Sequence, residues 1–290
     1  MIWVILVVFG LCAGSFVSAV VWRVRQQELS EEQGTGNKEQ AKKNTNYQLP
    51  TTNYSVLKGR SVCPHCHHIL TWYDLLPLFS WLALRGRCRY CGKRISWQYP
   101  LTEVSAVAVF TVSYAYWPGG VYGVGDWLML IAWLLTSVGL LALLIYDLKW
   151  MILPNKILYP TLAVAVSGRL VYILSFEPDK IDALINWALS LLIASGLFLL
   201  IYTASSGRWI GFGDVRLGLI LGTVLSEPLN SMLMIFVASV LGTAVILPAL
   251  ITGRRKMTSR LPFGPFLISA TFLVLIFGQG VVDWYKDFLG

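Results

Sequence analysis

The stretch WLMLIAWLLTSVGLLALLIYDLKW, residues 127–150, decides the fold class. Its first part, 127–146, carries no charge, and a helix of about 20 residues crosses a hydrocarbon core of about 30 Å. The whole chain has the same character, because 56% of its 290 residues are hydrophobic and only 13% are charged. A water-soluble protein of this length needs a more charged surface. The sequence therefore predicts an all-α, polytopic membrane protein.

Apolar segments of spanning length recur along the chain. We predict eight transmembrane helices at 2–22, 101–117, 127–146, 157–176, 183–202, 209–225, 232–251 and 263–280. The first is not a cleaved signal peptide, since it lacks a basic N-terminal region and a small-x-small cleavage site. The sixth is the weakest, because only 217–225 is free of charge. It is retained because its loss would place the basic cluster 254–256 outside.

The positions of lysine and arginine orient these spans, because basic residues stay on the cytoplasmic side of short loops. With the N-terminus outside, 20 of the 23 basic residues lie in cytoplasmic loops at 23–100, 147–156, 203–216 and 252–262. Both termini are then outside. The net charge of +8 reflects this topology and suits anionic lipid, so no nucleic-acid partner is predicted. Arg169 lies inside the fourth span, where we expect it to snorkel outward or pair with Asp179 or Asp182.

The chain divides at the ends of the large cytoplasmic loop. Residues 1–22 form the first transmembrane helix, 23–100 the loop, and 101–290 a membrane-embedded domain. Within the loop, 26–57 is polar with few large apolar residues, which predicts a flexible arm. From 61 to 100 the composition changes to aromatic residues and cysteines.

Two CxxC pairs in this loop predict a metal centre. Cys63 and Cys66 form the first pair, and Cys88 and Cys91 form the second. Each pair aims two thiolates at one point, and their spacing is close to that of zinc ribbons. We predict a structural zinc ion, with four reduced thiols or a redox pair as alternatives. The neighbouring residues His65, His67 and His68 are expected to be exposed, since four thiolates complete a tetrahedron.

Two acids beside the spans predict chemistry. Asp147 ends the quoted stretch, and Asp214 lies in IGFGDVRLG, residues 210–218. The third span runs inward and the sixth runs outward, which puts both acids at the cytoplasmic end at similar depth. A nearby pair of carboxyls shares one proton, so one member can deprotonate an attacking water while the other protonates the substrate. This is the arrangement of an aspartyl hydrolase.

The surroundings of Asp214 fit that interpretation. Gly211 and Gly213 are expected to adopt backbone angles closed to other residues and to let a substrate strand approach. Arg216 is expected to lie near the acid. Each acid also has a simpler explanation, because Asp214 suits a helix start and Asp147 suits a membrane edge beside Lys149.

With these residues assembled, the chain resembles the prepilin peptidases, membrane aspartyl proteases that process type IV pilins and type II secretion pseudopilins. The resemblance covers nearly the whole chain. It is carried by GLCAGSFVSAVVWRV at 10–24, CPHC at 63–66, WYDLLPLFSWLALRGRCRYC at 72–91, ISWQYPLTE at 95–103, YDLKWMILPNKI at 146–157, GFGDVRLG at 211–218 and LPFGPFLISA at 261–270. Three positions depart from the family pattern: Ser18 stands for the common Asn, Asn155 for Asp, and Arg216 for Lys.

The resemblance implies cleavage of a short basic leader after a glycine, on the cytoplasmic side of a bacterial inner membrane. Asp147 and Asp214 match the family's catalytic pair, and the four cysteines match its zinc-associated loop. Many members with that loop also methylate the new N-terminus with S-adenosylmethionine. No glycine-rich methyl-donor fingerprint is visible in this chain, so that activity rests on the resemblance alone.

Three other functions stay open on the sequence alone. A presenilin-like protease would cut inside the bilayer, and the GxGD motif also occurs in that group. A proton-coupled transporter would use the same two aspartates as proton carriers. A non-catalytic assembly protein would use the four-cysteine loop to bind a partner.

Overall fold

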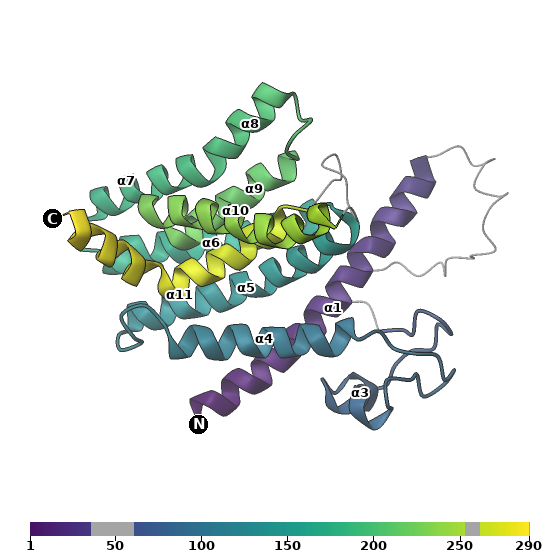
Figure 1. Cartoon of the computed structure of the whole chain (residues 1–290). Helices are drawn as coiled ribbons and strands as arrows, with labels where there is room; N and C mark the ends of the chain where they lie inside the picture. The colour runs from purple at the N-terminus through teal and green to yellow at the C-terminus, as the bar shows by residue number, and fades with distance from the viewer. Residues whose placement is uncertain (36–60, 253–261, 290) are drawn as a thin grey trace. The chain divides into compact units, whose positions relative to one another are not determined.

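The computed structural model describes residues 1–35, 61–252 and 262–289, and within them it is mostly helical (Figure 1). The longest non-helical stretch lies within 61–97, and the only β-structure in the described part is two isolated bridges, Val62 with Ile69 and Arg87 with Arg94. The elements are α1 (Ile2–Thr35), η1 (Trp72–Leu75), α3 (Phe79–Ala83), α4 (Gln98–Ala115), α5 (Val124–Trp150), α6 (Asn155–Phe176), α7 (Lys180–Leu191), η2 (Leu192–Gly196), α8 (Leu197–Ser205), α9 (Phe212–Leu225), α10 (Pro228–Ile251) and α11 (Gly264–Leu289).

Six stretches of helix in the described part are long and apolar enough to cross a membrane. They lie in α1, α5, α6, the continuous run α7–η2–α8, α10 and α11. The chain is thus a multi-pass membrane protein, but the predicted number of eight spans is not confirmed. The first turns of α4 carry Gln98, Thr102 and Glu103, and α9 has 14 residues, which cover only about 21 Å.

The first helix is longer than predicted. The helix α1 continues to Thr35, so residues 26–35 of the predicted flexible arm are helical. They are polar, but Gln, Glu and Leu favour helix, and Arg25 pairs with Glu28 one turn on at 3.6 Å. The rest of the arm, 36–57, lies outside the described residues.

The chain divides into two compact units, Met1–Phe110 and Thr111–Gly290. In the first unit, α1 and α4 touch backbone to backbone at two glycines four residues apart. A Cβ on Gly10 would lie 2.8 Å from Cα of Val107, and one on Gly14 would lie 2.4 Å from Cα of Glu103. Small residues at this spacing are what permits such an approach in a membrane, where packing rather than hydrophobicity joins helices.

In the second unit, the short helix α9 packs against α6, α11 and the run α7–η2–α8. Eight of its 14 residues are buried. Gly218 and Gly222 face the π-helical turn η2 and the end of α7, where a Cβ on Gly218 would lie 2.3 Å from the Ala194 carbonyl oxygen. The hydroxyls of Ser190 and Ser195 donate to α9 carbonyls at 2.8 Å. Close packing and these bonds fix the position of α9.

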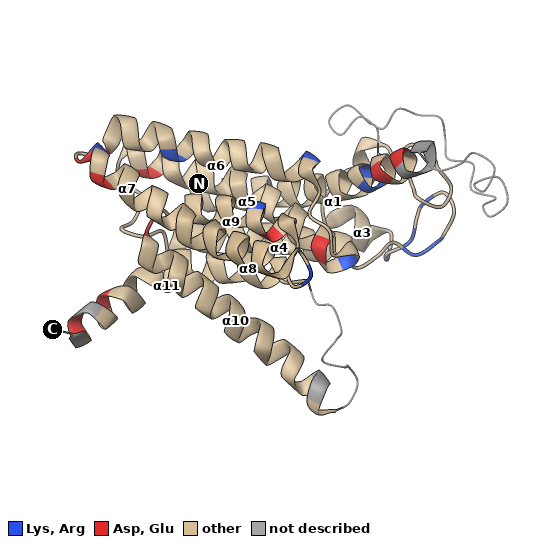
Figure 2. Ribbon diagram, turned by 90° about the horizontal axis from the view of Figure 1, so that it is seen from above, with Lys and Arg blue, Asp and Glu red and all other residues tan. Residues whose placement is uncertain are grey.

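Charged residues lie mostly near helix ends and in loops, and the helices are otherwise built of uncharged residues (Figure 2). This distribution agrees with a membrane-spanning bundle, because a charge in the hydrocarbon region is unfavourable. Leucine, valine and phenylalanine side chains are exposed on α10 and α11, as expected for helix surfaces that face lipid.

Candidate active site and four-cysteine centre

Asp147 lies near the C-terminal end of α5, and its side chain is buried although it carries no ion pair among the described residues. The helix α11 begins beside it, and the backbone N–H of Gly264 donates to its carboxylate. A Cβ on Gly264 would lie 2.6 Å from Oδ2 of Asp147 and 3.5 Å from Cδ2 of Leu217 on α9. The first residue of α11 therefore touches both helices that carry the predicted acids.

Asp214 is the third residue of α9 and is half-buried. Its carboxylate accepts the backbone N–H of Gly211, the N-cap residue, which satisfies a donor that the first helical turn leaves free. The carboxyl groups of Asp214 and Asp147 are close enough to repel each other electrostatically. The structure thus brings the two predicted acids together at one end of the second unit, from two different helices.

The glycines before Asp214 are needed for a different reason from the one predicted. Gly211 has φ −75° and ψ 148°, which any residue can adopt, and Gly213 has no left-handed backbone, so the expectation of closed angles is wrong. A Cβ on Gly213 would press on Leu153 at 3.2 Å. Close approach of the α5–α6 connection explains Gly213, whereas Gly211 has room for a side chain.

Arg216 points to a neighbour other than Asp214. Its guanidinium donates to Oδ1 of Asn155, the first residue of α6, and lies 4.6 Å from the ring centre of Phe212. Asn155 and Arg216 are two of the three departures from the family pattern, and they contact each other. In this chain the two residues thus form a polar bond between α6 and α9.

Sequence reasoning gave no role to Gly264. Its motif LPFGPF was noted only as part of the resemblance, and it lies 117 residues beyond Asp147 in the chain. The one available signal was a glycine followed by proline directly before an apolar segment, which marks a helix start but not its neighbour.

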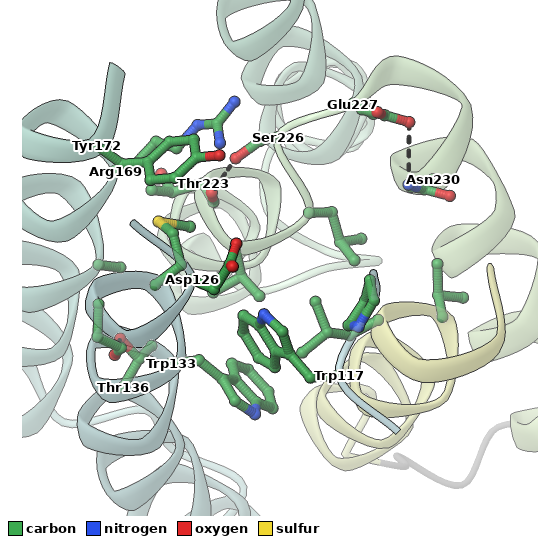
Figure 3. A pocket seen from close by; sticks show the side chains of 18 of the residues that line it. Trp117, Asp126, Trp133, Thr136, Arg169, Tyr172, Thr223, Ser226, Glu227 and Asn230 are labelled. Carbon is green, nitrogen blue, oxygen red and sulfur yellow. Dashed lines mark hydrogen bonds between the residues drawn. The ribbon is translucent and has the colours of Figure 1, made fainter. Parts of the chain in front are cut away.

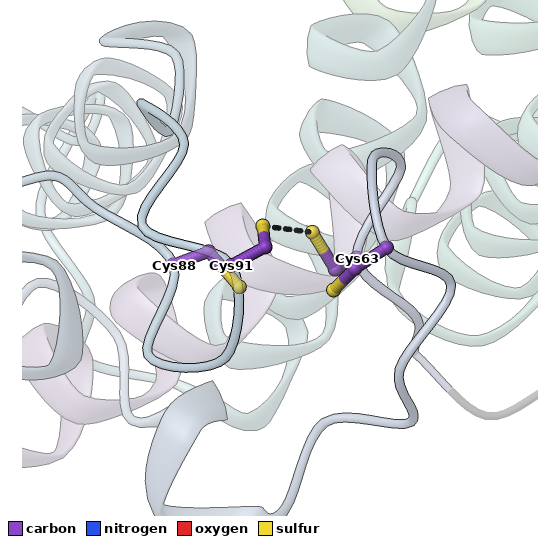
Figure 4. A group of neighbouring side chains, drawn as sticks. Cys63, Cys88 and Cys91 are labelled. Carbon is purple, nitrogen blue, oxygen red and sulfur yellow. Dashed lines mark hydrogen bonds between the residues drawn. The ribbon is translucent and has the colours of Figure 1, made fainter.

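The four cysteines of the first unit form a cluster (Figure 4). The sulfur atoms of Cys63, Cys66, Cys88 and Cys91 all lie within 4.8 Å of one another, and Cys63 and Cys91 are 4.0 Å apart. A tetrahedral zinc ion with bonds of about 2.3 Å needs sulfurs about 3.8 Å apart. The donor set and its spacing therefore fit such an ion with little adjustment.

The two halves of this centre repeat one local structure. In each half, a β-bridge joins the residue just before the first cysteine of the pair to the residue six positions after that cysteine. The bridges are Val62–Ile69 and Arg87–Arg94. The position after the second cysteine is left-handed in each, with φ +54° at His67 and +68° at Gly92. Burial would raise the pKa of the Cys88 thiol, but the N–H groups of Cys91 and Tyr90 donate to its sulfur and bring it to about 7. Such donors stabilise a thiolate ligand.

The predicted exposure of the neighbouring histidines is confirmed, since His65, His67 and His68 all lie at the surface. The segment between the two halves is tied down by two acids. Asp74 accepts from Thr71, Arg89 and Tyr90. Glu103, buried in α4, accepts the backbone N–H of Leu78 at 2.7 Å.

Fold and site together define a class of protein: multi-pass membrane enzymes that hold two acids at one end of a helix bundle. Two family models match the chain, the Bacterial Peptidase A24 N-terminal domain over residues 8–117 and the Type IV leader peptidase family over residues 133–247. The chain belongs to the prepilin leader peptidase/N-methyltransferase family. It is therefore a peptidase by family.

Relatives match over most of their length. A prepilin leader peptidase/N-methyltransferase of Aeromonas hydrophila is 32% identical over 281 residues, which cover 96% of this chain and 91% of the relative. One of Burkholderia pseudomallei is 32% identical over 94% of this chain and 84% of the relative. One of Bacillus subtilis is 29% identical over 80% of this chain and 87% of the relative. No solved structure matches.

Proposed function

We propose that the protein is an aspartyl endopeptidase of the bacterial inner membrane. It cleaves the basic leader of type IV prepilins or pseudopilins after a glycine, on the cytoplasmic side, and both of its termini lie outside. The observation that supports this most is the meeting of Asp147 and Asp214 from α5 and α9. The chain belongs to a peptidase family, which favours this function over a proton-coupled transporter or a non-catalytic assembly protein.

In the proposed reaction, the two carboxyl groups share one proton because both cannot easily ionise at close range. The ionised carboxyl removes a proton from a water molecule as its oxygen attacks the scissile carbonyl carbon. The protonated carboxyl gives its proton to the carbonyl oxygen, which forms a tetrahedral gem-diol. As the C–N bond breaks, the carboxyl that took the proton from water gives it to the leaving nitrogen, and the other carboxyl recovers a proton from a gem-diol hydroxyl. The pair then again shares one proton. Which residue begins as the base is a property of the coupled pair.

The location of the pair explains the substrate. A prepilin presents a basic leader followed by an apolar helix, and the junction between them lies at the edge of the bilayer. The proposed pair lies at a helix end rather than at mid-helix, since Asp147 is three residues from the end of α5 and Asp214 is third in α9. A peptide bond at that junction can reach these acids without entering the hydrocarbon core.

Two further groups belong to this proposal. Cys63, Cys66, Cys88 and Cys91 would hold zinc, which as a closed tetrahedral ion stabilises the local fold and takes no part in catalysis. The relatives are also named as N-methyltransferases, and we assign this chain the same second activity on the new N-terminal amine. S-adenosylmethionine would supply the methyl group for it.

The experiment uses full-length protein in detergent, with a prepilin-type substrate that has a basic leader, a Gly–Phe junction and an apolar helix. We expect Asp147→Asn and Asp214→Asn each to abolish cleavage, as read by mass spectrometry. Asp182→Asn, which changes an acid in the first turn of α7, serves as the matched control and should retain activity. Cleavage that persists in either single variant would exclude the two-acid mechanism. The same spectra report methylation.

A further inference from the structure

A cavity of about 290 Å³ lies in the second unit, far from the proposed catalytic pair (Figure 3). Its walls come from α5, α6 and α11, from the end of α9 and the start of α10, and from the connection between α4 and α5. Asp126 lines it near the start of α5, 21 residues and about 32 Å along that helix from Asp147. The cavity reaches inward to Thr136 and opens at the end of the bundle where α5 begins. The proposed peptidase chemistry does not use it.

Arg169 of α6 supplies a cation that its surroundings satisfy only in part. Its side chain is 13% exposed and lies 3.9 Å from Glu177, the residue that ends α6. The expected partners Asp179 and Asp182 are therefore wrong. Its Nε is buried and has no hydrogen-bond partner among the described residues. A guanidinium carries five N–H donors in a plane, the geometry that matches a phosphate.

The cavity also carries more acid than base. Asp126, Glu177 and Glu227 line it together with the single Arg169. Asp126 is occupied by the backbone N–H groups of Tyr122 and Gly123, and Glu227 accepts from Asn230 at 3.2 Å. A simple anion would be repelled by this excess of negative charge. A ligand with a phosphate must therefore also carry a cation.

The far side of the cavity suits such a cation. Figure 3 shows Arg169 and Tyr172 on one side, Glu227 and Asn230 on another, and Trp117 and Trp133 below both groups in this view. The Oδ1 of Asn230 is buried and has no partner among the described residues, so it can accept an N–H. Aromatic rings attract an ammonium group. Donor and acceptor sites are thus separated across the cavity.

We propose that this cavity binds a phosphoethanolamine group, the zwitterionic headgroup of a phospholipid. The phosphate lies against Arg169, and the ammonium lies toward Glu227 and Asn230. The volume equals that of about ten water molecules, which is sufficient for a group of about eight non-hydrogen atoms. The position suits a lipid, because the ends of spanning helices lie at the level of the headgroups and Trp is enriched there.

The test is native mass spectrometry of delipidated, full-length protein. Phosphatidylethanolamine, phosphatidylglycerol and phosphatidylcholine with identical acyl chains are added separately. We expect preferential binding of phosphatidylethanolamine, because phosphatidylglycerol lacks the ammonium and phosphatidylcholine has no N–H to donate. Soluble glycerophosphoethanolamine is added as a competitor. Competition is expected, because all the proposed contacts go to the headgroup, and its absence at a saturating concentration of competitor would count against the proposal.

Two variants separate recognition from folding. Arg169→Gln should weaken binding of phosphatidylethanolamine roughly tenfold or more, as expected for a lost charge-assisted hydrogen bond, and Arg169→Lys should restore part of it. Glu227→Gln changes an exposed acid and should bring the preference over phosphatidylglycerol close to one. Lys180→Gln, at the start of α7, is the control and should change neither value. Equal binding of all three lipids, or a preference that survives both Arg169→Gln and Glu227→Gln, would overturn the proposal.

Discussion

The substitution Gly264→Ala tests the geometry of the proposed catalytic pair most directly. The added methyl carbon would lie 2.6 Å from Oδ2 of Asp147 and 3.4 Å from its Cγ, whereas ordinary contact begins at 3.4 Å. The carboxylate would have to move by about 0.8 Å or rotate away from the N–H of Gly264. A displacement of this order at a reacting group lowers a rate by about 100-fold.

The energy leads to a similar value. Loss of a hydrogen bond to a charged group amounts to about 1.5–3 kcal/mol, or about 10- to 100-fold in rate. We therefore expect kcat/KM for a prepilin-type substrate to fall by about 10- to 100-fold in Gly264→Ala, with the protein still folded.

Gly280→Ala is the matched control, because it makes the same change in the same helix at a position with no neighbour within 4 Å. It should retain activity and gain slightly in stability from the better helix propensity of alanine. Full activity of Gly264→Ala at an unchanged unfolding temperature would refute the placement of α11 against Asp147.

Three further predictions concern the first unit. Replacement of Cys88 by Ser should abolish retention of one zinc ion per chain, as measured by elemental analysis, because a tetrahedral site then loses one of its four ligands. Gly92→Ala should destabilise the four-cysteine centre by about 1 kcal/mol through backbone strain alone, because φ is +68° and an added Cβ would meet no atom within 4 Å. His67→Gly should stabilise the centre by about the same amount, because φ of His67 is also positive, and chelator-induced zinc release measures both effects. Burial raises the pKa of Asp74, but hydrogen bonds from Thr71, Arg89 and Tyr90 outweigh burial and lower the pKa overall. The ionised carboxylate therefore stabilises the folded loop above the ordinary pKa of about 4, and this stabilisation is lost as pH falls through the lower pKa of the folded state. Zinc release should therefore steepen below about pH 4 in the wild type relative to Asp74→Asn, and identical profiles would count against this.

Apolar runs and paired motifs were enough to predict the membrane class, the cysteine cluster and the meeting of the two acids. Hydropathy finds helices that are apolar along their whole length, such as α5, because their signal is the run itself. The CxxC pairs carry their geometry within four residues each, so the spacing predicts the cluster directly.

Features that depend on neighbours distant in sequence could not be predicted. The sixth span is predicted over 209–225 because the basic cluster 254–256 would otherwise lie outside, whereas Gly211 is the N-cap and α9 begins only at Phe212. The pairing of Asn155 with Arg216 joins residues 61 positions apart, and nothing in either local pattern indicates it. The need for a small residue at Gly213 lies in the contact with Leu153 and not in its own backbone angles.

Glu103 also has a consequence for the order of events during synthesis. Its backbone lies against Gly14 of α1, and its carboxylate holds the N–H of Leu78. The ribosome synthesises these three residues in the order 14, 78, 103, so Gly14 and Leu78 cannot make their contacts with Glu103 until Glu103 has been added. Until α4 has emerged, the segment that carries exposed Trp72 and Phe79 is held by the contacts of Asp74 within the loop and not by Glu103. A nascent chain halted before Gln98 would therefore present a less firmly held aromatic segment to chaperones and proteases, and α4 fixes its backbone at Leu78.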